Sequence, residues 1–137
     1  MRDELKKRSR FEMYHGTPNR VNLDGPRITL NPRSVFLLNA AAYKALGNPG
    51  AVALGYDEAT RTIGMIPQDP RNSTSFPVKG KVNHKKYTYR IIHASPFCRH
   101  FNITPKRTVL FTRIDIDNDG YLLLELSTAV RVTRGSR

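Results

Sequence analysis

The chain has 137 residues, about the length of one ordinary domain, and it contains no run of the roughly 20 apolar residues that a membrane-spanning helix needs. It contains 23 lysines and arginines but only 11 aspartates and glutamates. The resulting formal net charge of +12 indicates a polyanionic partner such as nucleic acid. Cys98 is the only cysteine, which excludes an intrachain disulfide, and the charged first ten residues do not form an ordinary secretory signal. We therefore expect a cytoplasmic protein with no membrane segment.

The first half of the chain predicts a basic arm followed by strands, a helix and a hairpin. Residues 1–26 mix charges with turn formers, and only residues 3–13 have the pattern of a short helix. Alternating apolar residues then predict strands at about 28–30 and 35–38. Asn39 is placed to cap a helix that Gly47 ends, and residues 52–65 read as a β-hairpin that turns at 57–60.

The second half repeats this order after a segment rich in proline and serine. We expect residues 68–77 to be a linker, and strands to follow at 78–82 and 87–92. Ser95 is the expected N-cap of a second short helix, which Asn102 ends. A second hairpin is expected from an alternating run that starts at Val109 and returns at 122–126, and residues 127–137 are expected to form a basic tail.

The repeated order suggests an internal duplication with one copy in residues 27–67 and the other in residues 78–126. Few residues are identical between the copies, so two unrelated β-rich halves with the same element order remain the alternative. Either interpretation predicts a mainly β protein with short helices.

Each half resembles the swapped-hairpin domain of the AbrB, MazE and SpoVT family. The first copy matches through Leu38-Asn39, the helix up to Leu46-Gly47, and the runs 51–57 and 62–67; the second matches through 97–103, 106–115 and 121–125. The glycine-arginine pair and the proline often seen before the helix in that family are absent. The resemblance implies that the two units close a small barrel, either as a monomeric pseudo-dimer or in a homodimer, and that the protein is a DNA-binding regulator or antitoxin.

Two lines of reasoning lead to the candidate binding residues. In the family, basic residues near the first strands contact DNA, and charge density alone points to residues 79–90, where Tyr87 and Tyr89 are placed to stack on bases if they face outward. The alternative is that the tyrosines face the core and the lysines only solvate an edge strand. The candidates are Arg27, Arg33, Lys79, Lys81, Lys85, Lys86, Tyr87 and Arg90.

Two other groups of residues suggest metal chemistry. Residues 115–120 resemble the start of a calcium loop, but Leu126 stands where the last ligand belongs, so a hairpin turn is the preferred interpretation. Cys98 and His100 project about 200° apart on a helix, so we expect a buried thiol and an exposed imidazole instead of a metal or catalytic site. We expect no cofactor, no metal and no enzymatic activity.

The sequence therefore predicts a nucleic-acid-binding protein, with duplex DNA as the favoured partner. Two alternatives remain open. One is a basic interaction or structural protein that docks an acidic protein through its basic tails, and the other is an RNA-binding protein.

Overall fold

A computed structural model describes residues 25–82 and 88–132 of the chain. These residues form a mainly β protein with two short helices, which confirms the mainly β class that the sequence predicts. The elements in chain order are β1 (Ile28–Leu30), β2 (Val35–Leu38), α1 (Ala40–Ala45), β3 (Ala51–Asp57), β4 (Thr62–Gln68), β5 (Phe76–Pro77), β6 (Lys79–Val82), β7 (Thr88–His93), α2 (Ser95–Phe101), β8 (Val109–Leu110), β9 (Ile114–Ile116), β10 (Leu122–Glu125), the 3-10 helix η1 (Leu126–Thr128) and β11 (Val130–Arg131).

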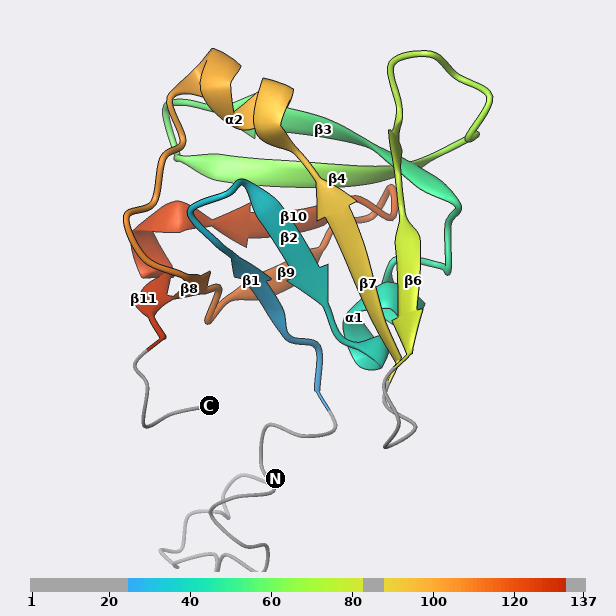
Figure 1. The fold of residues 1–137 in the computed structure, drawn as a ribbon, viewed down its shortest axis with the longest axis horizontal. Coiled ribbons are helices and arrows are strands. Elements are labelled where there is room, and N and C mark those ends of the chain that lie inside the picture. Colours follow the sequence, from blue (N-terminus) through green and yellow to red (C-terminus); the bar gives the residue numbers. More distant parts are fainter. Residues whose placement is uncertain (1–24, 83–87, 133–137) are drawn as a thin grey trace, which may run out of the picture.

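The strands form two antiparallel sheets that enclose one hydrophobic core. The six-stranded sheet has the order β11-β8-β1-β2-β7-β6, and the five-stranded sheet has the order β5-β3-β4-β10-β9. In Figure 1 the six-stranded sheet lies in front of the other, with α2 at the top and α1 at the bottom. Within the described ranges no strand pair joins the two sheets, so the predicted closure into a barrel is not part of the observed pairing.

The strand pairing follows a two-fold pattern. The hairpins β1–β2 and β6–β7 meet through β2 and β7 in one sheet. In the other sheet the hairpins β3–β4 and β9–β10 meet through β4 and β10. Each helix follows the inner strand of its hairpin in the six-stranded sheet. The repeated element order in the sequence therefore corresponds to a repeated pattern of pairing.

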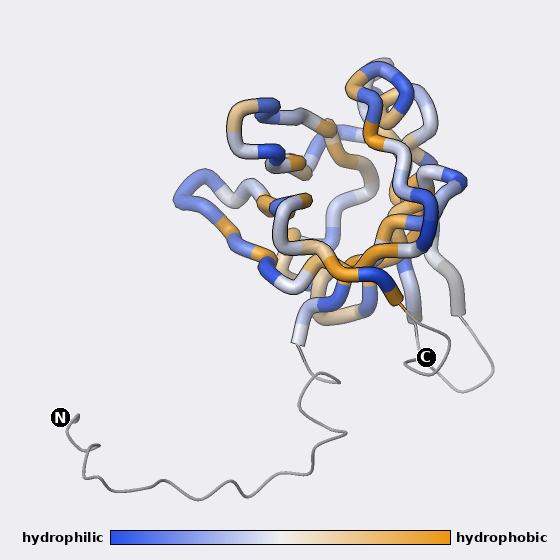
Figure 2. The backbone as a smooth tube through the Cα atoms, turned by 90° about the vertical axis from the view of Figure 1, so that its left-hand side faces the viewer, coloured by the Kyte–Doolittle hydropathy of each residue, from blue (hydrophilic) through white to orange (hydrophobic). Residues whose placement is uncertain are grey.

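Alternation of apolar residues fixes which side of each strand enters the core. Ile28 and Leu30 of β1 lie opposite Leu38 and Phe36 of β2, and all four side chains are fully buried. Burying a side chain of this size contributes about 1.5–3 kcal/mol, so a register slip of one residue would lose several such contributions at once. Figure 2 shows the same division along the chain, with many of the projecting loops hydrophilic.

Asn39 forms the start of α1 as the sequence predicts, and it also ties the helix to β1. Its side-chain oxygen accepts hydrogen bonds from the backbone amides of Ala42 and Arg27, both at 2.9 Å, and its amide group donates to the Gly25 carbonyl at 2.9 Å. Gly47 follows the C-cap with a φ of 93°, a conformation that glycine adopts without strain. One asparagine therefore orients both the helix and the entry into the first strand.

The second helix begins one residue earlier than the sequence predicts. Ala94 occupies the N-cap position and Ser95 is the first helical residue, with Pro96 next to it in the first turn. The Ala94 amide donates to the Ser34 carbonyl at 2.8 Å, which holds residue 94 against β2 until the helix starts. Asn102 ends the helix in the left-handed conformation, as predicted.

The predicted second hairpin is divided between the two sheets. β9 pairs with β10, but β8 pairs with β1 and β11 in the six-stranded sheet. The residue after β8 explains the difference, because the Phe111 ring is 2% exposed and stacks on Phe36 at a centroid distance of 6.4 Å. Its amide also donates to the Ile28 carbonyl. The packing of Phe111 therefore keeps β8 in the six-stranded sheet and away from β10.

Parts of the predicted linker and tail are strands. Within the predicted linker 68–77, Phe76 and Pro77 pair with β3 at the edge of the five-stranded sheet, an edge position that tolerates the missing proline amide. Within the predicted tail 127–137, Val130 and Arg131 form the edge strand β11. The expected helix at 3–13 and most of the expected arm lie outside the described residues. No helix in the described part of the chain is both long and apolar enough to cross a membrane.

Replacing Asn39 with alanine removes the helix cap and leaves the Arg27 amide without its partner. We expect Asn39→Ala to lower the free energy of unfolding by about 1–2 kcal/mol, measured by denaturant unfolding followed by circular dichroism. Asn118→Ala, at an exposed turn position, is the matched control and should change this free energy by less than about 0.5 kcal/mol. Equal effects of the two substitutions would contradict the capping role.

Candidate nucleic-acid interface

The six-stranded sheet has one face in the core and one face toward solvent. Because Ile28, Leu38 and Ile92 are buried, the residues that alternate with them point to the other side, which we call the outer face. One line of paired residues crosses this face from β6 to β11, and we call it the outer row. Its members are Lys79, Ile91, Leu37, Thr29, Leu110 and Val130.

The outer face brings together two of the predicted binding residues, Lys79 and Arg27. Lys79 is exposed at one end of the outer row. Arg27 precedes the buried Ile28 and therefore lies on the same face, at the start of β1. The backbone of Lys81 lies opposite Tyr89 in the β6–β7 pair. The sequence left open whether the tyrosines face the core or the solvent. Tyr89 alternates along β7 with the inward-facing Arg90 and Ile92, so it points to the outer face.

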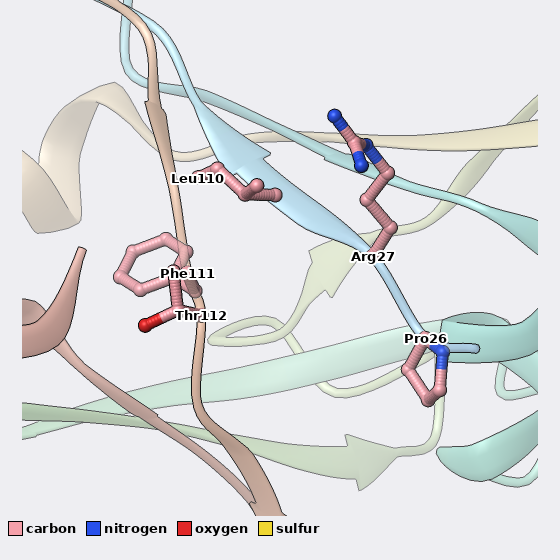
Figure 3. Close-up of a pocket in the computed structure, with 5 residues that line it drawn as sticks. All are labelled: Pro26, Arg27, Leu110, Phe111 and Thr112. Carbon is pink, nitrogen blue, oxygen red and sulfur yellow. The ribbon is translucent and has the colours of Figure 1, made fainter. Parts of the chain in front are cut away.

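A shallow hollow adjoins Arg27 where the pairing of β1 with β8 ends. Pro26, Arg27, Leu110, Phe111 and Thr112 line it, and its volume is about 170 Å³ (Figure 3). In Figure 3 the Leu110 side chain extends toward the Arg27 side, whereas the Phe111 ring lies on the other side of its strand. The hollow therefore presents one guanidinium beside an apolar wall.

Arg90, another predicted binding residue, belongs to the inner side of β7. Its guanidinium lies over the Tyr43 ring of α1, at 4.3 Å from the ring centroid, and it faces Gly80, where no side chain intervenes. The Tyr43 hydroxyl in turn donates to the Pro49 carbonyl at 2.6 Å. Arg90 thus fastens α1 to the sheet through a cation–π contact.

Arg33 is separated from Arg27 by the length of β1. It lies in the turn after β1, at the opposite end of that strand from Arg27. The Asn31 side chain shapes this turn by accepting hydrogen bonds from the amides of Arg33 and Val35. The structure therefore does not place Arg33 beside Arg27. Lys85, Lys86 and Tyr87, which join β6 to β7 in sequence, lie outside the described residues.

Carboxylates gather on the opposite side of the molecule. A groove of about 390 Å³ on the solvent face of the five-stranded sheet is lined by Asp57, Asp115 and Glu125. Its floor contains Gly55 and Gly64, which lie directly opposite each other in β3 and β4. Negative charge here repels a polyanion, so this electrostatic division favours binding on the outer face of the other sheet.

The ion pairs within the described residues do not involve Arg27 or Lys79. Within the described ranges two ion pairs occur, Arg71–Asp69 at 2.8 Å and Arg113–Asp115 at 3.3 Å, and both are exposed. Hydrogen bonds from Arg71 hold the pKa of the Asp69 carboxyl below its ordinary value. Neither Arg27 nor Lys79 pairs with a carboxylate of the described residues.

The two groups of residues that suggested metal chemistry have the positions expected from the alternative interpretations, a hairpin turn and a buried thiol. The Asp117 carboxylate accepts hydrogen bonds from the amides of Asp119 and Tyr121, which forms the predicted hairpin turn. Cys98 is 1% exposed and His100 is exposed, as predicted. The described residues contain no group of three or more histidines, cysteines, aspartates and glutamates arranged to hold a metal ion.

The apolar members of the outer row were not predicted as part of the site. Leu37 is 36% exposed and Val130 is 49% exposed, and Ile91 and Leu110 are half-buried. The sequence places most of these residues in expected strands, but only the long-range pairing of β2 with β7 and of β1 with β8 aligns them in one row.

Comparison of the chain with protein-family models, with characterised proteins and with solved structures gives no match. The functional argument therefore depends on the geometry and charge described above.

The contact between Arg90 and Tyr43 is measurable by a double-mutant cycle. We expect Arg90→Ala and Tyr43→Leu, alone and combined, to give a coupling energy of about 1 kcal/mol in denaturant unfolding. Arg99→Ala, at an exposed position of α2, is the control and should leave stability nearly unchanged. A coupling energy near zero would show that the contact does not hold α1.

Burial raises the pKa of the Cys98 thiol, and a hydrogen bond with Ser34 offsets part of this rise. Because the pKa is higher in the folded protein, the buried neutral thiol contributes fully to the free energy of unfolding below the ordinary thiol pKa. This contribution to stability is lost as the pH rises from that value through the pKa of the folded state. We expect folded protein at about pH 8 to react with a thiol reagent more than about tenfold more slowly than unfolded protein. Equal rates in the presence and absence of denaturant would contradict the burial of this group.

Proposed function

We propose that this protein binds nucleic acid through the outer face of the six-stranded sheet. The observation that carries the proposal is the position of Arg27 and Lys79 on one solvent-facing surface without carboxylate partners among the described residues. Ammonium and guanidinium groups on such a surface neutralise phosphates and release counterions. The formal net charge of +12 and the acidic groove on the other side support the same orientation.

The predicted role as a DNA-binding regulator or antitoxin remains part of this proposal. It depends on the resemblance to swapped-hairpin domains, and so does the proposal that the chain is a pseudo-dimer of two copies closing a barrel. The two-fold pattern of pairing, in which β2 meets β7 and β4 meets β10, supports a duplication. The division of the second hairpin between the two sheets is a departure from an equal repeat.

A matched pair of double variants tests the binding surface. Arg27→Ala with Lys79→Ala should weaken binding about tenfold at low salt and reduce the slope of log affinity against log salt by about 1.4–1.8, as expected for two lost phosphate contacts. The control, Lys106→Ala with Arg107→Ala, removes the same two charges from the connection between α2 and β8. Gel-shift titrations at two salt concentrations measure both effects. Equal weakening by the two double variants would show that net charge alone drives binding.

A further inference from the structure

The middle of the proposed interface is apolar. Ile91, Leu37, Leu110 and Val130 occupy four of the six positions of the outer row, and Thr29 lies between Leu37 and Leu110. Across six strands spaced by about 4.8 Å this row is about 24 Å long. Antiparallel sheets usually place polar residues on a face that meets water. A row of four apolar residues on such a face, interrupted only by Thr29, indicates that a partner covers it.

A second line of side chains crosses the outer row along β7. Tyr89, Ile91 and His93 alternate with the inward-facing Arg90 and Ile92, so all three point to the outer face. Residues two apart on a strand are separated by about 6.8 Å, which is about twice the spacing of stacked bases in a duplex strand. The phenol, the alkyl group and the imidazole therefore offer successive flat or apolar surfaces to separated bases.

Cations border this apolar surface. Lys79 ends the outer row on β6, and Arg27 lies on the same face at the start of β1. The occupant must therefore combine negative charge with flat apolar faces. A second copy of this chain would bring two formal charges of +12 together. Duplex DNA presents phosphates, but its base faces are stacked inside the helix. A single strand presents both phosphates and bases.

We propose that the outer face holds the unstacked bases of a single-stranded nucleic acid, with Tyr89, Ile91 and Leu37 contacting the bases and Lys79 and Arg27 contacting the phosphates. This proposal rests on the proposed function and specifies its substrate class. It differs from the expectation drawn from the sequence, which favours duplex DNA. The difference arises because the apolar row becomes visible only when the strands are paired.

Three labelled probes of equal length test the proposal. They are a thymidine oligonucleotide of about ten residues, the same strand without its bases, and a duplex of that length. Fluorescence anisotropy at low salt should show the thymidine strand binding about tenfold more tightly than the strand without bases and more tightly than the duplex. Both single strands carry the same phosphate charge, so a difference between them measures the contribution of the bases.

A double variant of the apolar row completes the test. Leu37→Thr with Ile91→Thr keeps strand-compatible side chains and should weaken binding of the thymidine strand about tenfold, while binding of the strand without bases stays unchanged. Ile116→Thr, at an exposed apolar position on the edge of the five-stranded sheet, is the control and should change neither affinity. Circular dichroism of each variant establishes that it is folded.

The outcomes separate the two proposals. If the duplex binds as tightly as the thymidine strand, or the two single strands bind equally, the single-strand proposal is wrong and the nucleic-acid-binding function stands. If none of the three probes binds at low salt, the proposed function itself is wrong. Tighter binding of a polyglutamate peptide than of any oligonucleotide would identify an acidic protein as the occupant and overturn both.

Discussion

The pairing of β2 with β7 is the constraint on which the rest of the molecule depends. It joins the two halves of the chain, and its register places Phe36 opposite Ile92 in the core and Leu37 opposite Ile91 on the outer face. A slip of one residue would break both pairs and turn the core-facing side chains of one strand to the outer face. The same pairing brings α1 and α2, which follow the two strands, to opposite ends of the core in Figure 1. Fold and surface therefore depend on one set of backbone hydrogen bonds.

Local signals in the sequence were sufficient for most of the individual elements. Asn39 and Gly47 mark the two ends of α1 because capping and left-handed backbone conformation depend on residues close in sequence. Asn102 marks the end of α2 for the same reason. The mainly β class followed from apolar alternation. These features need no knowledge of which strands become neighbours.

Long-range features escaped prediction because residues far apart in sequence determine them. The run after Val109 looks like the first strand of a hairpin, but stacking of Phe111 on Phe36 joins it to the other sheet. Arg90 belongs to a basic stretch of sequence, yet alternation turns it inward onto Tyr43 while Lys79 remains on the outer face. Charge in a linear stretch therefore pointed to strands of the six-stranded sheet, but it did not predict which side chains share a face.

The two halves occupy matching places in the pairing pattern but differ in their surroundings. β6 is an edge strand and begins with Lys79, whereas its counterpart β1 is covered on its far side by β8 and β11. A true two-fold dimer presents every surface twice and in opposite directions. The single chain presents its cationic edge once, so the β6 end of the outer face differs from the β11 end. Such a surface has the asymmetry needed to distinguish the 5′-to-3′ direction of a strand from the reverse, which a two-fold symmetric surface lacks.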